Sequence, residues 1–82
     1  MEFEAHINVM PHKELLDPQG KAVLKNLPNV GIFVKDVRIG KRISVKLEAD
    51  NKEAAAKKVE EACNKMLTNP VMEYFEYELL EV

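Results

Sequence analysis

The sequence predicts an α+β fold, in which a small antiparallel sheet carries two helices. Over residues 2–10, apolar and polar residues alternate, which is typical of a strand with one face in water. Two later segments, 18–27 and 53–67, instead repeat their apolar residues every three or four positions, the period of an amphipathic helix. Residues 37–49 and 71–82 alternate again, so strands and helices are interspersed along the chain.

The first strand is expected to end at Pro11, because proline cannot donate a hydrogen bond to a sheet. Its inward face is Phe3, Ala5, Ile7 and Val9. The first helix is expected to begin at Asp17-Pro18, since aspartate can accept hydrogen bonds from free amides and proline fits the first helical position. Pro28 is expected to stop this helix after about three turns. Its apolar stripe is Gly20, Val23, Leu24 and Leu27.

Residues 37–49 keep all their apolar side chains on one parity, with an interruption around Gly40. A three-residue loop at 40–42 would pair Ile39 with Ile43 and keep that parity, whereas a two-residue turn would shift it. We therefore predict two strands joined by a three-residue hairpin, with one long bent strand as the alternative. The residues of shared parity are Val37, Ile39, Ile43, Val45, Leu47 and Ala49.

A second helix is expected after Asp50, because Asp50 and Glu53 resemble a capping box. Asn69-Pro70 should end it, and a last strand should follow to residue 82. Its apolar stripe is Ala55, Val59, Ala62, Cys63, Met66 and Leu67, and the last strand points Phe75, Tyr77 and Leu79 inward.

The predicted order is strand, helix, strand, strand, helix, strand. Right-handed crossovers place both helices on one face of a four-stranded antiparallel sheet, the ferredoxin-like βαββαβ arrangement. A chain of 82 residues suits one such domain, spanning residues 1–82. In that arrangement Glu2 and Glu4 would lie near Arg42 and Lys46 on the open face.

The charge balance excludes several classes of partner. Twelve basic and 14 acidic residues leave a net charge of -2, which argues against duplex nucleic acid or an anionic membrane as the main partner. No apolar run approaches the roughly 20 residues of a transmembrane helix. The start of the chain is acidic where a secretory signal would be basic, so we expect a cytoplasmic protein.

Few residues could carry chemistry. His6 and His12 lack the spacing of a metal or catalytic motif. Cys63 lies within an apolar helical stripe, which favours a packed, inert thiol. Arg38, Lys41 and Arg42 form a basic cluster around Gly40 that could hold a phosphate or a partner's carboxylate, or could be only a solvated turn. The sequence therefore predicts no catalytic residue, no metal site and no cofactor site.

Four segments resemble one known family. Leu16-Asp17-Pro18-Gln19-Gly20, Val37-Arg38-Ile39-Gly40-Lys41, Asn69-Pro70-Val71-Met72-Glu73 and the helical stretch 59–67 occur in the order and spacing of the PurS subunit of phosphoribosylformylglycinamidine synthase (formylglycinamide ribonucleotide amidotransferase). The resemblance covers nearly the whole chain. It departs near Pro28, where the family usually continues its first helix.

The resemblance implies a non-catalytic role in de novo purine biosynthesis. Such a subunit bridges the PurQ glutaminase and the PurL synthetase, and assists ammonia transfer for the ATP- and glutamine-dependent conversion of formylglycinamide ribonucleotide to formylglycinamidine ribonucleotide. It implies a homodimer, possibly a tetramer. It also implies that ATP and magnesium are used by the complex through PurL and that this chain binds neither.

Two of the four segments are expected to contact the partner subunits: Asp17, Pro18, Gln19 and Gly20 at the first helix, and Arg38, Gly40 and Lys41 at the turn. The alternative is that these residues are only a helix cap and a loop. A regulatory module of the same topology that binds a small molecule is a competing hypothesis. An acylphosphatase-like hydrolase is disfavoured, because the loop after the first strand, residues 11–14, contains no arginine.

Overall fold

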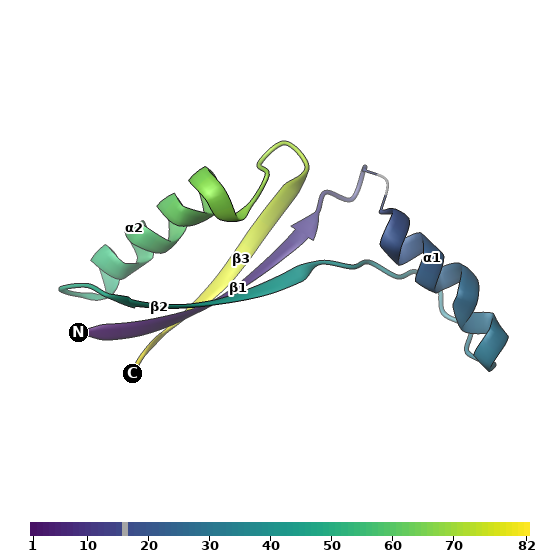
Figure 1. Ribbon diagram of the computed structural model, residues 1–82, viewed down its shortest axis with the longest axis horizontal. Helices are drawn as coiled ribbons and strands as arrows, with labels where there is room; N and C mark the ends of the chain where they lie inside the picture. Colours follow the sequence, from purple (N-terminus) through teal and green to yellow (C-terminus); the bar gives the residue numbers. More distant parts are fainter. Residues whose placement is uncertain (16) are drawn as a thin grey trace.

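The protein is described by a computed structural model covering residues 1–15 and 17–82, so Leu16 of the first family segment lies outside the described residues. Strand β1 (Glu2–Pro11) is the centre of a three-stranded antiparallel sheet in the order β2-β1-β3 (Figure 1). Strands β2 (Lys41–Glu48) and β3 (Glu73–Glu81) pair on either side of it. Two α-helices complete the fold, which confirms the predicted α+β class.

The alternation in β1 decides which of its faces is buried. Its four odd-numbered apolar residues are almost fully buried, and Ile7 lies opposite both Ile43 and Tyr77 in the sheet. On the open face Glu4 lies opposite Lys46, as predicted, whereas Glu2 lies opposite Glu48. The buried residues of β1 are Phe3, Ala5, Ile7 and Val9.

Helix α2 (Lys52–Ala62) covers the sheet. It begins at Asn51, whose side-chain oxygen accepts a hydrogen bond from the Ala54 amide at 2.8 Å, so the predicted cap at Asp50 is one residue too early. The helix continues into a π-helical turn, Cys63–Leu67. Thr68 ends that turn by donating its hydroxyl to the Cys63 carbonyl at 2.8 Å.

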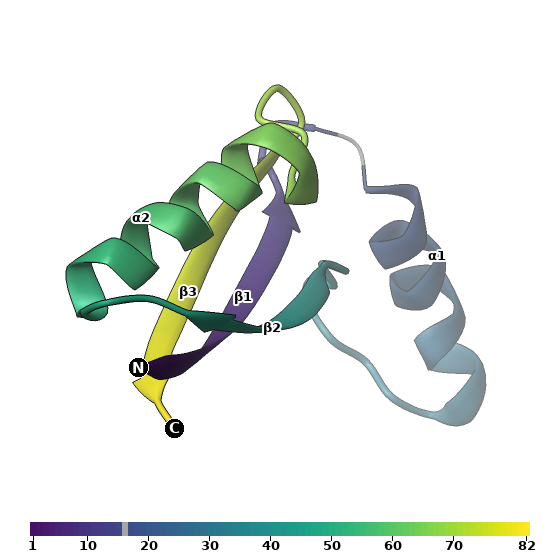
Figure 2. The same ribbon diagram turned by 60° about the vertical axis from the view of Figure 1, so that its left-hand side comes forward.

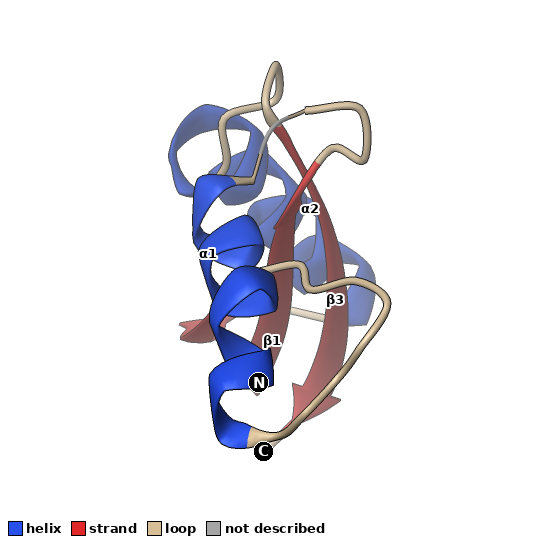
Figure 3. Cartoon of the chain, turned by 90° about the vertical axis from the view of Figure 1, so that its right-hand side faces the viewer, coloured by secondary structure: helices blue, strands red, loops and turns tan. Residues whose placement is uncertain are grey.

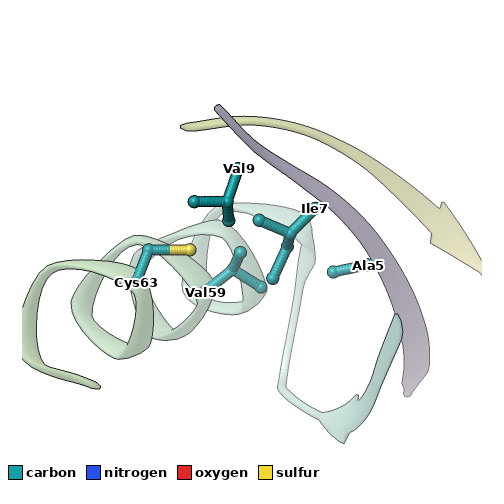
Figure 4. Packing of buried hydrophobic residues seen from close by; sticks show 5 residues of the cluster. All are labelled: Ala5, Ile7, Val9, Val59 and Cys63. Carbon is teal, nitrogen blue, oxygen red and sulfur yellow. The ribbon is translucent and has the colours of Figure 1, made fainter. Parts of the chain in front are cut away.

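The core lies between α2 and the two strands that it crosses, β1 and β3 (Figure 2). Val59 and Cys63 of α2 and its last turn pack against the buried side chains of β1 (Figure 4). The predicted packed thiol is confirmed, since Cys63 is fully buried and burial, followed by the nearby Glu60 carboxylate, raises its pKa. On the rim, the Tyr77 hydroxyl donates to Glu60 at 2.7 Å, which raises the pKa of Tyr77 to about 12.

Helix α1 (Pro18–Asn26) does not join this core. Together with a 3-10 turn (Leu27–Val30) and the segment 31–38, it forms an arm that projects beyond the end of the sheet (Figure 1). Seen from that end of the molecule, α1 lies in front of the sheet (Figure 3). The molecule consequently measures 51 × 27 × 15 Å and has a radius of gyration of 16.2 Å. A compact chain of this length has a radius of gyration of about 12 Å.

Three expectations about the middle of the chain are wrong for this structure. No strand is present at 37–39 and 40–42 is not a hairpin loop, because β2 begins at Lys41 and the chain before it runs on toward the arm. Three strands, not four, are found in the described ranges, so the ferredoxin-like arrangement is not confirmed. Of the two α-helices that the structure describes, α2 packs against β1 and β3, whereas α1 makes no comparable contact with the sheet. Alternation records which side chains share a face, and it does not reveal whether a partner strand lies beside them.

No helix within the described ranges is both long enough and apolar enough to cross a membrane.

The packing of the core predicts a large difference between two apolar substitutions. Ile7→Ala removes a fully buried side chain and should lower the free energy of unfolding by about 2–5 kcal/mol. Met66→Ala, at a side chain that is 84% exposed, should change it by less than about 0.5 kcal/mol. Urea denaturation followed by circular dichroism measures both values, and equal losses would contradict the assigned core.

Candidate functional site

A cleft of about 500 Å³ lies where the arm meets the sheet. Three of the four family segments contribute to its walls, although they are far apart in the sequence. The segment at 17–19 begins the arm, the segment at 39–41 returns from it, and the segment at 69–73 leads into β3. The lining residues are Pro11, Leu15, Asp17, Pro18, Gln19, Ile39, Gly40, Lys41, Asn69, Met72 and Glu73.

Asp17 connects the segment that enters the arm with the segment that returns from it. One carboxylate oxygen accepts the Gly20 amide at 3.0 Å and so caps α1, as predicted. The other oxygen accepts the Ile39 amide at 2.9 Å, across 22 residues of sequence. These two hydrogen bonds, first that from Ile39, together with the nearby Arg38 guanidinium, hold the pKa of the Asp17 carboxyl below its usual value. One side chain therefore both starts the arm and fastens its return.

Two glycines permit the close approach of backbone at this junction. A β-carbon on Gly20 would overlap the Asp17 carboxylate and the Val37 carbonyl oxygen. A β-carbon on Gly40 would overlap the Met10 sulfur and the Val9 carbonyl oxygen. A larger residue at Gly20 would separate the start of α1 from the returning segment, and one at Gly40 would push that segment away from the end of β1.

Two basic residues of the turn are also engaged. The Arg38 guanidinium donates a hydrogen bond to the Pro11 carbonyl at the end of β1. The Lys41 ammonium lies 3.8 Å from the Glu73 carboxylate across the cleft, and its side chain is 54% exposed. Arg38 thus acts within the junction, while Lys41 remains accessible at its surface.

The third wall is a tight turn organised by Asn69. Its carbonyl accepts the amides of Met72 and Glu73, and its side-chain oxygen accepts the Val71 amide at 3.1 Å. The Glu73 carboxylate accepts a hydrogen bond from the Asn69 backbone amide at 2.9 Å. The turn is joined to β1 by the His12 amide, which donates to the Met72 carbonyl at 3.0 Å.

The structure brings all seven predicted interface residues to this junction. Five of them line the cleft, Gly20 is buried beneath it and Arg38 lies beside it; the five are Asp17, Pro18, Gln19, Gly40 and Lys41. Sequence reasoning did not assign Asn69, Met72 and Glu73 to the site. Their signal was present, because they belong to the family segment at 69–73.

The charged groups of the cleft are already paired with backbone amides or with one another. The carboxylates of Asp17 and Glu73 are committed to backbone amides, and the cleft lining, as far as it is described, includes no cysteine, serine or histidine. His6 lies on the open sheet face, 3.5 Å from Glu4. No group of three metal-binding side chains occurs in the parts of the chain that the structure describes. The side chains of the described lining that carry a basic or nucleophilic group are Asp17, Lys41 and Glu73, and each is engaged in the contacts given above.

Comparison with known proteins identifies the family. The sequence profile of PurS, described as phosphoribosylformylglycinamidine (FGAM) synthase, matches residues 4–81. The chain belongs to the PurS family. The PurS subunit of Thermotoga maritima is 40% identical over 81 residues, which cover 98% of this chain and 96% of the relative. The PurS subunit of Bacillus subtilis is 36% identical, over 98% of this chain and 95% of the relative.

Solved PurS structures share the shape as well as the sequence. A chain in the structure of PurLQS from Thermotoga maritima superimposes with a TM-score of 0.91 at 37% identity, covering 98% of this chain and 99% of that chain. PurS of Thermus thermophilus matches with a TM-score of 0.86 at 36% identity, over 100% and 99% of the two chains. Scores this high over the full length require the arm to project in a similar direction in these PurS structures.

The two bonds of Asp17 predict a pH-dependent stability. Asp17→Asn keeps an oxygen for the Gly20 amide but sets an amide group against the Ile39 amide, so its melting temperature should fall below that of the wild type at pH 7. Because the folded pKa of Asp17 is lowered, its contribution is complete above the unfolded value of about 4 and is lost as pH falls through the lower folded value. The difference between the two proteins should therefore shrink below about pH 4.

Thermal denaturation at several pH values measures this difference. Asp50→Asn, an exposed aspartate beside the α2 cap, is the matched control and should leave the melting curve unchanged at every pH. A constant difference between Asp17→Asn and wild type down to pH 3 would show that the carboxylate charge does not hold the junction.

Proposed function

We propose that this chain is the non-catalytic small subunit of a phosphoribosylformylglycinamidine synthase complex in de novo purine biosynthesis. In this role it binds a PurQ glutaminase and a PurL synthetase, keeps them in register and assists the transfer of ammonia between them. The observation that carries the proposal is the full-length agreement with a chain of the Thermotoga maritima PurLQS structure, arm included. The complex would work in the cytoplasm.

The cleft supports a bridging role on chemical grounds. Its charged groups already pair with one another or with backbone amides, which makes the junction a pre-organised surface. We assign ATP and magnesium to the PurL partner and none to this chain. The subunit is proposed to act as a homodimer, with a tetramer as the larger possibility.

The contact surface is proposed to be the exposed rim of the cleft. Pro18, Gln19 and Lys41 present their side chains there, whereas Asp17, Gly20, Arg38 and Gly40 fix the backbone beneath them. The two roles that the sequence left open are thus divided between two sets of residues: one set contacts the partner and the other shapes the surface.

A reconstitution assay tests the bridging role. Purified PurL and PurQ should form formylglycinamidine ribonucleotide from glutamine at a substantial rate only when this chain is added, and should form a stable complex only in its presence. With ammonia in place of glutamine, PurL should form formylglycinamidine ribonucleotide without this chain. This control separates the transfer of ammonia from the reaction that PurL catalyses. Equal glutamine-dependent rates with and without the chain would overturn the proposal, and saturable binding of a nucleotide or amino acid to the isolated chain would then favour a regulatory module.

A pair of matched lysine substitutions tests the contact surface. Lys41→Ala should weaken assembly with PurL and PurQ by about tenfold, because it removes an exposed cation at the rim of the cleft. Lys65→Ala removes another exposed, ion-paired lysine, which pairs with Glu61 at 2.7 Å and does not line the cleft, and it should have no effect. Size-exclusion chromatography and titration calorimetry measure both, and unchanged assembly of Lys41→Ala would exclude its contact role.

A further inference from the structure

A second cavity, of about 400 Å³, adjoins the cleft at the base of the arm. It shares two lining residues with the cleft, Leu15 and Asp17. The other lining residues come from the chain that leads into the arm and from the segment 36–38 that returns from it. They are Lys13, Lys21, Asp36, Val37 and Arg38. This basic pocket is therefore continuous with the surface that is proposed to contact the partner subunits.

The three cations of the basic pocket differ in how they are held. Arg38 is half-buried, and its guanidinium donates a hydrogen bond to the Pro11 carbonyl, which orients the side chain. A guanidinium has five N–H donors, so most of them remain for a further acceptor. Lys13 and Lys21 are exposed, and within the described ranges no ion pair involves either of them. The pocket thus combines one oriented guanidinium with two lysines that have no carboxylate partner in the described chain.

The two acids of the lining decide which kind of anion the pocket suits. Both oxygens of Asp17 accept backbone amides, and Asp36 accepts the Val37 amide at 2.9 Å, so both carboxylates stay in place. Three cations and two carboxylates give the lining a net charge of +1. One carboxylate balances that charge. A phosphate group carries about −1.5 to −2 at pH 7 and would be repelled by the two carboxylates already present. The charge of the lining therefore favours a carboxylate.

The basic pocket lies in the part of the chain that has an excess of positive charge. Residues 12–42 contain seven basic and three acidic side chains, whereas the rest of the chain contains five basic and 11 acidic ones. The arm and its junction thus have a net charge of +4 and lie at one end of the long axis, while the remainder has a net charge of −6 (Figure 1). Ends of opposite charge orient a protein in the field of its partner. An acidic partner surface would therefore approach the arm end of this protein.

We propose that the basic pocket receives a carboxylate side chain from an acidic surface of one of the two partner subunits. The inference rests on the proposed bridging function and adds to it the chemistry of the contact. The Arg38 guanidinium pairs with the incoming carboxylate, and Lys13 and Lys21 lie against the acidic surface around it. Because the pocket and the cleft share Asp17, one continuous partner surface covers both.

Charge reversal at the two exposed lysines tests this proposal. Lys13→Glu/Lys21→Glu places two further carboxylates at the pocket and should raise the dissociation constant for assembly with PurL and PurQ by at least about a hundredfold. Lys25→Glu/Lys35→Glu is the matched control, because it changes the net charge equally at two exposed arm lysines outside the pocket. It should raise the constant by less than about threefold at physiological ionic strength. Titration calorimetry measures both constants. Equal weakening by the two variants, or unchanged assembly of Lys13→Glu/Lys21→Glu, would overturn the proposal.

Measurements on the isolated chain distinguish the other possible occupants. Lys13→Glu/Lys21→Glu should sediment like the wild type and should be folded by circular dichroism, because both lysines are exposed. A changed sedimentation would assign the pocket to a contact between copies of this chain and would overturn the proposal. Inorganic phosphate should show no saturable binding below about 1 mM, and such binding would assign the pocket to a phosphate instead. If the wild type formed no complex with PurL and PurQ, the bridging function itself would fail, whereas failure of this proposal alone leaves wild-type assembly intact.

Discussion

The two hydrogen bonds of the Asp17 carboxylate are the interaction on which the shape of this molecule depends. They connect the residue that leaves the sheet with the residue that returns to it, and they lie where Gly20 and Gly40 allow the backbones to approach closely. The hydrogen bond from Ile39 holds the returning segment beside the start of α1, and the cleft lies between this junction and the turn at Asn69.

Chain length is the second constraint. With 82 residues the protein has one small core, and its fully buried side chains come almost entirely from β1 and α2. The apolar residues of the arm add nothing to that core, so a folded monomer retains a large apolar surface. In the proposed bridging role, neighbouring proteins would bury the surface that this chain cannot bury itself.

The division between predictable and unpredictable features follows the range of the interactions. The face of β1, the cap at Asp17 and the burial of Cys63 each follow from side chains close together in sequence, and all were predicted correctly. The predicted cap of α2, Asp50, is one residue before the observed cap, Asn51. Both residue types are suitable N-caps, so local chemistry scarcely separates them. Asn69 was not assigned to the site, because its place in the cleft depends on the arm reaching the same end of the sheet.

The amino-acid sequence by itself determined the α+β class, the apolar face of β1 and of α2, and the set of residues that mark the family. Periodicity, capping chemistry and spacing are local properties, and they can be read without knowing where an element packs. Only the tertiary structure decided that residues 37–40 continue outward from β2, that α1 leaves the sheet, and that three separate segments enclose one cleft. The same alternation suits a strand paired in a sheet and an extended segment that leaves the sheet. The hydrogen bond between Asp17 and Ile39 at the base of the arm spans 22 residues of sequence, which is beyond the reach of any local pattern.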